Sequence, residues 1–569
     1  MAAVRIVGVF ALTVGILVGS AATARPAPVD ENTQVPVQFA DQALAWTGCA
    51  EQSLVDAVTE PDVYAVLRAP MLRDLECATV HTPLDWSRPD DGRSVEFRIS
   101  RLRATPQDRT PKALLTSPGG AGAGNLTSPS TTARALPQLR DVYDLYGFDA
   151  RGTATSTSAQ RCDRNLSGDP QLLGTGRYDT YDTLDFSPES LARQFDEAQR
   201  WMWACANGAD RTADGTSTLG YVNYWQTARD LDLARHLIGV PTWSYLGASQ
   251  GTALGAELIR TFPHRIDRWV FDSVASPSRT TTAAGIFDRY RTQYRRLEED
   301  FVPWLAGRDT AFGGTPTEVL ASLTALRANL VQKPVQLPGD RSFSGNDLNV
   351  VLLGVGNVAD EALAMTLSTV LAADRDRSGP QTIQALVNVV TTVRIPVVVG
   401  EQFETAAFGG DRSGWWTSMN CGSGTWERDP NAVAAEARAV AHDAPLTYLG
   451  MGLTAACAFW PEGNVEAYRG GGDDVPAGLI VHNEHDTVTA LSDAQQTRAA
   501  LPRSRLVTVA GKHRHLVLPV VQPLDTIGAP GTSVCATDTV LGYLLDGVLT
   551  PADIECRADD RLEAGKVPG

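Results

Sequence analysis

Apolar segments with the length of a strand alternate with helix-length segments along much of the chain. Residues 95–104, 113–120 and 143–152 are short apolar runs separated by turn signals, so they predict strands. The segment YWQTARDLDLARHLIGV at 224–240 has the periodicity of a helix, and strand, helix and strand signals follow it up to residue 275. This alternation predicts a largely parallel α/β sheet.

The pattern changes between residues 277 and 474. Helical stretches rich in Ala and Leu, such as TPTEVLASLTALRANLV, alternate there with Gly-rich connections, and strand signals are hard to find. Strand and helix signals resume at 477–486, 491–502 and 504–511, with a last helix near 537–549. We therefore predict an α/β core formed by 41–276 and 475–569, with an inserted helical lid at 277–474.

The first residues have the features of an export signal. Arg5 precedes an apolar run at 6–18 that is short for a membrane span, and the ATA triplet that ends at Ala24 matches a small-x-small cleavage pattern. An uncleaved N-terminal anchor is the alternative interpretation. We expect a signal peptide at 1–24, a Pro-rich leader at 25–40, secretion, and no stable membrane insertion once the signal is removed.

The cysteine pattern agrees with export. The chain has eight cysteines and no CxxC pair, which argues against zinc-ribbon and thioredoxin-like sites and favours disulfides. Pairing each cysteine with its sequential neighbour gives four local bridges, although spacing alone cannot choose among the possible connectivities. The cysteines are Cys49, Cys77, Cys162, Cys205, Cys421, Cys457, Cys535 and Cys556.

Composition and charge narrow the class of protein. Of the 569 residues, 43% are hydrophobic and 20% are charged, as in a globular enzyme. The formal net charge of −17 argues against a nucleic-acid partner, because that affinity comes mainly from Lys and Arg that neutralise phosphates. A neutral or cationic small substrate is compatible with this charge, and the sequence indicates no oligomeric state.

One serine lies between two glycines at a predicted strand-to-helix junction. Gly247, Ser249 and Gly251 form a GxSxG motif, which in this context predicts a nucleophile elbow. The turn is too tight for side chains at the glycine positions, and it raises the serine hydroxyl above the sheet. The backbone N–H of Gln250 would then meet a developing oxyanion at the helix N-terminus. A purely structural Gly-rich turn is the alternative.

An activated serine needs a base, and the base needs an acid to orient it. In hydrolases with such an elbow, the acid and then the histidine follow the serine, at the ends of later strands. Asp486 ends one predicted strand, and His513 and His515 follow the next one. We select Asp486 over Glu484 because it lies at the strand-to-turn junction. We select His515 over His513 because the residues after the strand extend the loop.

An early glycine-rich loop is the candidate for the second half of the oxyanion hole. The segment SPGGAGAGN at 117–125 follows a predicted strand, and the N–H of Gly119 or Gly120 would approach a substrate oxygen closely. A nucleotide-binding loop is the alternative, but the GxGxxG spacing fails at Asn125 and the GK[ST] of a P-loop is absent.

Zinc is a competing interpretation of the histidines near the predicted acid. Four of them lie close to carboxylates in sequence, but they lack the HExxH pattern of a zinc-binding helix. They are His482, His485, His513 and His515. We expect no metal and no cofactor, because the serine elbow already accounts for Asp486 and one histidine.

Several segments together resemble the secreted tripeptidyl and prolyl aminopeptidase branch of the α/β hydrolases. They are ECATVHTPLDWSRPDDG, SPGGAGAGN, YGFDARGTATS, ARDLDLARHLIG, GASQGT, CAFWP and VCATDTVLGYLLDGVLTPADIEC. The likeness covers most of the chain beyond the leader and is weakest in the lid. It implies an α/β-hydrolase fold with Ser249 as nucleophile, Asp486 as acid and a histidine of GKHRH as base. It also implies cleavage of short peptides from a free N-terminus.

Two departures from that family concern the substrate. The oxyanion loop reads SPGGAG where the family usually has NPGGPG, and Gly422-Ser423 occupies the place after Cys421 where an acidic residue is usual. The residue that would bind the substrate amine is therefore not identified by sequence. We expect a secreted serine aminopeptidase that releases di- or tripeptides, and a carboxylesterase with the same triad is the alternative.

Overall fold

The computed structural model describes fifteen stretches of the chain. They are 35–49, 73–105, 110–120, 125–153, 156–158, 160, 181–275, 282–308, 311–339, 341–355, 360–392, 410–462, 474–511, 514–518 and 533–558. The predicted signal peptide and most of the leader lie outside them. Within these stretches, no helix is both long enough and apolar enough to cross a membrane.

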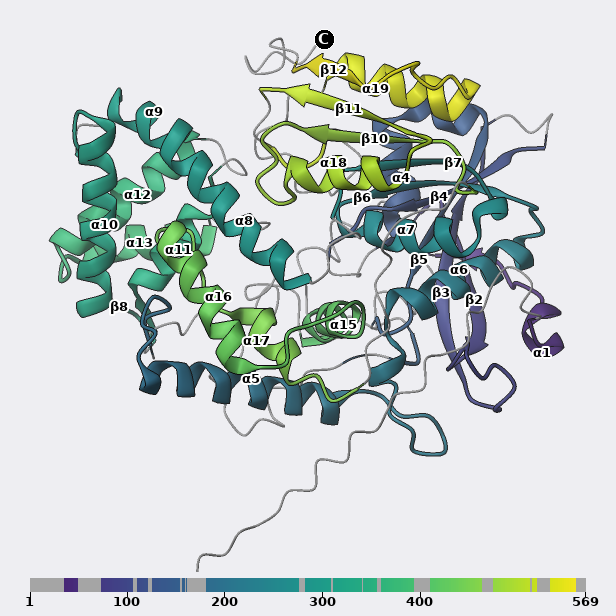
Figure 1. Ribbon diagram of the computed structural model, residues 1–569, viewed down its shortest axis with the longest axis horizontal. Coiled ribbons are helices and arrows are strands. Elements are labelled where there is room, and N and C mark those ends of the chain that lie inside the picture. Colours follow the sequence, from purple (N-terminus) through teal and green to yellow (C-terminus); the bar gives the residue numbers. More distant parts are fainter. Residues whose placement is uncertain are drawn as a thin grey trace, which may run out of the picture.

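A mostly parallel sheet of ten described strands forms the centre of the molecule (Figure 1). Its order is β1-β2-β3-β5-β4-β6-β7-β10-β11-β12. The pairs from β1 to β5 are antiparallel, and all pairs from β5 to β12 are parallel. The strands are β1 (Thr47–Gly48), β2 (Glu76–Pro83), β3 (Ser94–Leu102), β4 (Lys112–Ser117), β5 (Tyr143–Asp149), β6 (Trp243–Ala248), β7 (Ile266–Asp272), β10 (Gly478–Asn483), β11 (Ser504–Ala510) and β12 (Ile554–Arg557). The predicted, largely parallel α/β sheet is confirmed.

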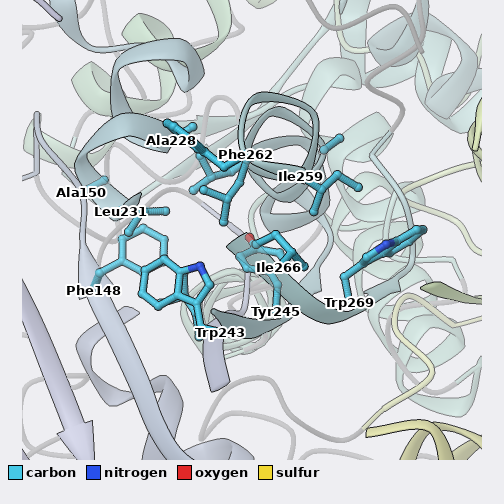
Figure 2. Close-up of a cluster of buried hydrophobic side chains, with 14 of the residues drawn as sticks. Phe148, Ala150, Ala228, Leu231, Trp243, Tyr245, Ile259, Phe262, Ile266 and Trp269 are labelled. Carbon is cyan, nitrogen blue, oxygen red and sulfur yellow. The ribbon is translucent and has the colours of Figure 1, made fainter. Parts of the chain in front are cut away.

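Helices cover both faces of this sheet, and as a result every residue of the central strands β6 and β10 is buried. On one face, α6 and α7 pack against Trp243 and Tyr245 (Figure 2), and α18 belongs to the same apolar cluster with Ile480. On the other face, α4 and α19 pack against Leu246 and Val481. These helices are α4 (Ser128–Ala135), α6 (Tyr224–Ile238), α7 (Gln250–Thr261), α18 (Leu491–Ala500) and α19 (Val534–Leu541), and the short α1 (Val37–Ala40) lies near β2.

The ends of α6 illustrate how sequence sets an element. Asn223 caps its N-terminus by accepting a hydrogen bond from the N–H of Gln226. Gly239 ends it in the left-handed conformation, with φ of +84°, which a glycine adopts without strain. The helix predicted at 224–240 therefore ends where the glycine stops it.

Ten more helices of the described stretches form a group beside the sheet, which we call the helical group. It lies on the side toward which β11 and β12 point (Figure 1). Its helices are α5 (Pro188–Gly208), α8 (Thr282–Arg296), α9 (Val302–Ala306), α10 (Pro316–Gln332), α11 (Gly345–Leu352), α12 (Asp360–Arg375), α13 (Pro380–Thr392), α15 (Gly410–Cys421), α16 (Pro430–Asp443) and α17 (Gly452–Ala458). A small hairpin of β8 (Val335–Leu337) and β9 (Arg341–Phe343) accompanies them.

The helical group draws on more of the chain than the segment 277–474. Helix α5 precedes the elbow in sequence, yet it packs against α17 and shares an apolar cluster with α8 and α16. A second cluster, formed by α9 to α13, makes a core of its own. Among the described residues, the short turn η7 (Leu297–Phe301) connects α8 to α9 in this group. Other short 3-10 or π-helical turns adjoin elements of the sheet and its covering helices: η2 (Asn125–Thr127), η3 (Pro137–Asp141), η5 (Leu219–Tyr221), η6 (Pro263–Arg265) and η8 (Gly542–Asp546).

Three disulfides join cysteines that are neighbours in sequence. They are Cys49–Cys77, Cys421–Cys457 and Cys535–Cys556. Cys205 is also disulfide-bonded, and its sequential neighbour Cys162 lies outside the described residues. Local pairing therefore holds for the three bridges that the structure describes at both ends.

Candidate active site

Ser249 occupies a sharp turn between β6 and α7. Its φ is +51°. Only two other non-glycine residues in the described stretches have a positive φ, Ser273 and Leu516. The backbone N–H of Ser249 donates to the carbonyl oxygen of Asp272, the last residue of the neighbouring strand β7 (2.9 Å). Its side chain remains partly exposed at the carboxyl edge of the sheet. This is the geometry of a nucleophile elbow.

The two glycines of GxSxG are required by close packing around the serine. A Cβ atom at Gly247 would lie 2.5 Å from the ring of Tyr245, and one at Gly251 would lie 2.5 Å from the carbonyl oxygen of Ser117. Both distances are far shorter than a carbon contact allows. The Tyr245 hydroxyl also donates to the carbonyl oxygen of Gly251 (2.6 Å), which fixes the start of α7.

The glycine-rich loop after β4 packs directly against the elbow. Gly119 and Gly120 both have positive φ, +82° and +69°. A Cβ atom on Gly119 would lie 2.9 Å from the backbone nitrogen of Gln250 and 2.4 Å from the carbonyl oxygen of Ala248. The predicted oxyanion-hole residues Gln250, Gly119 and Gly120 are thus brought together beside Ser249.

The predicted acid and base form a pair at the ends of β10 and β11. His515 Nδ1 lies 2.9 Å from Asp486 Oδ2 and 3.0 Å from Oδ1. Asp486 is buried, and its Oδ1 accepts the backbone N–H groups of Val488 and Thr489. The pair leaves His515 Nε2 as the ring nitrogen that can exchange a proton.

The electrostatics of this pair keep the acid ionised. Burial raises the pKa of Asp486, but the charge of His515 and its hydrogen bond oppose that effect. The charge of His482 and the N–H of Thr489 oppose it as well, so the pKa is lowered to about 2. The carboxylate therefore stays charged at any working pH and holds the Nδ1–H tautomer of His515.

Glu484, the alternative acid, makes other contacts. Glu484 accepts the N–H of Gly511 (2.8 Å) and lies 3.6 Å from His485 Nε2, with both side chains nearly half exposed. His513 lies outside the described residues. Among the residues that the structure describes, no three His, Cys, Asp or Glu side chains are grouped to hold a metal ion.

A chain of hydrogen bonds links the elbow to the helical group, and sequence reasoning missed it. Gln250 Nε2 donates to the Tyr224 hydroxyl (2.7 Å), and the N–H of Tyr224 donates to Ser423 Oγ (3.1 Å). Ser423 therefore lies against the start of α6, where its hydroxyl accepts this hydrogen bond. The signal in the sequence was only indirect: Tyr224 opens the helix that packs against α7.

Residues at the ends of β7 and β10 contact the loop that carries His515, and these too were missed. They are Asp272, Ser273 and Asn483. A signal was available, because polar residues at the carboxyl ends of parallel strands meet at one edge of the sheet. The site therefore contains a serine, a histidine bound to a carboxylate, and backbone N–H donors. These are the groups that acyl transfer through a serine requires.

Two family models match the chain, and each contains part of this site. The model described as "alpha/beta hydrolase fold" matches residues 112–334, which include Ser249. The model described as "TAP-like protein" matches residues 447–556, which include Asp486 and His515.

Relatives that match the chain at 24–28% identity include peptidases and a carboxylesterase. The chain is 26% identical over 499 residues to tripeptidyl aminopeptidase of Streptomyces coelicolor, with 85% of this chain and 83% of the relative covered. It is 24% identical over 502 residues to carboxylesterase B of Mycobacterium tuberculosis, with 85% and 87% covered. It is 28% identical over 203 residues to serine protease Hip1 of Mycobacterium tuberculosis, with 36% of each chain covered. Similarity to these relatives therefore supports a hydrolase, but it does not decide between peptide bonds and ester bonds as the substrate.

Proposed function

Because the chain is an α/β hydrolase with a TAP-like C-terminal segment, we propose that it is a serine aminopeptidase. It would release di- or tripeptides from peptides with a free N-terminus. The observation that carries the proposal is the site itself: an elbow serine and a buried carboxylate–histidine pair, in a chain similar over 85% of its length to a tripeptidyl aminopeptidase.

The proposed reaction proceeds through an acyl-enzyme. His515 Nε2 accepts the proton of Ser249 Oγ as that oxygen attacks the scissile carbonyl carbon. The N–H of Gln250, with that of Gly119 or Gly120, stabilises the negative charge on the carbonyl oxygen. His515 then gives its proton to the departing amine, and a water molecule that His515 activates hydrolyses the ester of Ser249.

Carboxylesterase activity is the second candidate, and the similarity to carboxylesterase B favours it. The same triad cleaves esters and amides. The place where an amine-binding acid is usual in the peptidase branch carries Ser423, whose hydroxyl accepts from Tyr224. The proposal therefore assigns no carboxylate to the substrate amine.

The two functions are separated by the N-terminus of the substrate. The kcat/KM of the wild-type protein is measured on one fluorogenic tripeptide amide, on the N-acetylated form of that amide and on a short-chain acyl ester. The variant Ser249→Ala serves as the blank. An aminopeptidase must bind the free ammonium group of its substrate, whichever residue does so, and removal of one partner from a desolvated charge pair costs roughly 2 to 5 kcal/mol. Acetylation is therefore expected to lower kcat/KM by at least about tenfold. Equal cleavage of the blocked peptide, or hydrolysis of the ester alone, would overturn the aminopeptidase in favour of the esterase.

Export is part of the proposal. We infer that residues 1–24 are removed as a signal peptide, and the disulfides are compatible with an oxidising compartment. N-terminal sequencing of the protein from culture medium is expected to begin at Arg25. Full-length protein retained in the cell envelope would contradict cleavage.

A further inference from the structure

We propose that Asp272, Ser273 and Asn483 are positioning residues that clamp the loop 514–518, and so hold His515 against Asp486. This inference rests on the proposed role of His515 as the base. It does not depend on whether the substrate is a peptide or an ester. The hydrogen bonds that their side chains make to this loop all go to its backbone.

The first half of the clamp comes from the end of β7. Asp272 Oδ1 accepts the N–H of Val517 (2.9 Å), and its Oδ2 accepts the N–H of Leu518 (2.8 Å). The hydroxyl of Ser273 accepts the N–H of Leu516 (3.0 Å). Three consecutive N–H groups directly after His515 are therefore bound by two side chains of one strand end.

The second half comes from the end of β10. Asn483 Nδ2 donates to the carbonyl oxygen of Arg514 (2.7 Å) and to that of Leu516 (2.9 Å). These two carbonyls flank His515 on either side. The side chains at the end of β7 thus bind N–H groups of the loop, and the side chain at the end of β10 binds the carbonyls on both sides of His515. Asp486 binds the His515 ring.

Backbone strain is concentrated at the same contacts. Leu516 has φ of +73° and Ser273 has φ of +54°, which are unfavourable for residues with a Cβ atom. Leu516 is bound at both its N–H and its carbonyl by the clamp. A loop free in solution would leave that conformation, so the clamp is what maintains it.

Asp272 makes the clamp sensitive to pH. It is fully buried, and burial raises its pKa to about 6, against the opposing N–H groups of Val517 and Leu518 and the charge of His515. Two other titratable groups near His515, Asp486 and His482, belong to the β10 end. From the turn after β6, the backbone N–H of Ser249 donates to the carbonyl oxygen of Asp272. Protonation of Asp272 removes one of its two acceptor oxygens.

Three variants test the clamp. Asp272→Asn removes the charge and keeps the shape, and Asn483→Leu removes both donors at similar size. Asp232→Asn is the matched control: it is a buried carboxylate on α6, paired with Arg235 and Arg265 and outside the loop contacts. Each protein is measured for kcat and KM on the best substrate, for the pH profile of kcat/KM, for the rate of labelling by a fluorophosphonate, and for Tm.

The clamp predicts a specific pattern. Asp272→Asn and Asn483→Leu are expected to lower kcat and the labelling rate about 10- to 100-fold with KM changed less than threefold. In wild type, protonation of Asp272 contributes to the acid limb of the pH profile, and Asp272→Asn is expected to remove that contribution and make the limb less steep. Asp232→Asn is expected to lower Tm and leave the profile unchanged.

Three results would overturn the clamp. They are kcat within twofold of wild type in both loop variants, an acid limb in Asp272→Asn as steep as in wild type, and a wild type that no fluorophosphonate labels. If Asp272→Asn does not fold, Asn483→Leu and the milder Ser273→Ala decide through the same kcat and KM comparison. A wild type that hydrolyses only esters refutes the aminopeptidase proposal but leaves this test intact.

Discussion

The backbone of Ser249 is held in a conformation that few non-glycine residues adopt. Such positions cost of order 1–3 kcal/mol, and they persist only where the surroundings enforce them. Tyr245, Gly251 and the carbonyl of Asp272 provide that enforcement here. The three strained non-glycine residues of the described stretches, Ser249, Ser273 and Leu516, all lie in or beside the site.

His515 and His513 offer the clearest comparison at the residue scale. His515→Ala is expected to lower kcat by about 10⁴, as loss of a triad member does, because Ser249 then has no proton acceptor. His513→Ala is expected to cost far less, because the ring of His515 is the one bound to Asp486. Steady-state kinetics on one substrate measure both, and the reverse ranking would move the base to His513.

At the scale of elements, one buried ion pair joins β2, β5 and α6. Arg151, just after β5, donates to both oxygens of Asp230 on α6 and to the carbonyl oxygens of Pro83 and Leu84. Asp230 also accepts the Trp86 indole N–H. Each side-chain nitrogen of Arg151 and each carboxylate oxygen of Asp230 therefore has a hydrogen-bond partner. Such hydrogen bonds offset the cost of burying the two charges.

Removal of one partner from that pair is expected to destabilise the protein strongly. Arg151→Leu leaves the Asp230 carboxylate buried without its cation, so we expect a loss of about 3–5 kcal/mol in the free energy of unfolding. Asp196→Ala, which breaks a largely exposed pair with Arg200 on α5, is the control and is expected to cost under about 1 kcal/mol. Denaturant unfolding measures both, and similar costs would show that burial of the Arg151 pair does not matter.

Local pattern was enough to predict the elements around the nucleophile. The strand, the GxSxG turn and the helix are contiguous, so the predicted elements agree with β6, Ser249 and α7. The order of acid and histidine along the chain led to Asp486 and His515, which the fold brings together.

Contacts between distant parts of the chain could not be predicted in the same way. The four-residue strand β12 exists because it pairs with β11, and its own sequence gives little signal. Helix α5 has an ordinary amphipathic pattern that does not reveal its partners in the helical group. Asp272 and Val517 are 245 residues apart, and only the sheet makes them neighbours.

At the scale of the whole molecule, α15 connects the helical group to the core. The indole N–H of Trp415 donates to the carbonyl oxygen of Arg151 (3.2 Å), and Ser423, just after the helix, accepts from Tyr224. The disulfide Cys421–Cys457 ties the end of α15 to α17. This connection brings the helical group to the residue that follows the nucleophile, through Tyr224 and Gln250.

Loss of that disulfide is expected to affect substrate binding as well as stability. Replacement of Cys421 and Cys457 by Ser opens a bridge of sequence separation 36, worth about 4 kcal/mol in the chain-entropy model. We expect a lower Tm and a KM raised more than kcat is lowered.

The same replacement of Cys535 and Cys556 is the control. That bridge, of separation 21, ties α19 to β12 at the far edge of the sheet. Its loss is expected to lower Tm while KM stays unchanged. Equal KM values in the two variants would show that α15 has no part in substrate binding.

The central claim is that Ser249 is a nucleophile activated for acyl transfer, and covalent labelling tests it most directly. Wild type and Ser249→Ala are treated with a fluorophosphonate, and intact-protein and peptide mass spectrometry locate the adduct. A general-base-activated serine reacts with such a probe, whereas a serine in a structural turn does not. We expect one adduct per chain, on Ser249, and none in Ser249→Ala. An adduct that persists in the variant, or a wild type that stays unlabelled while it turns over substrate, would contradict the assignment.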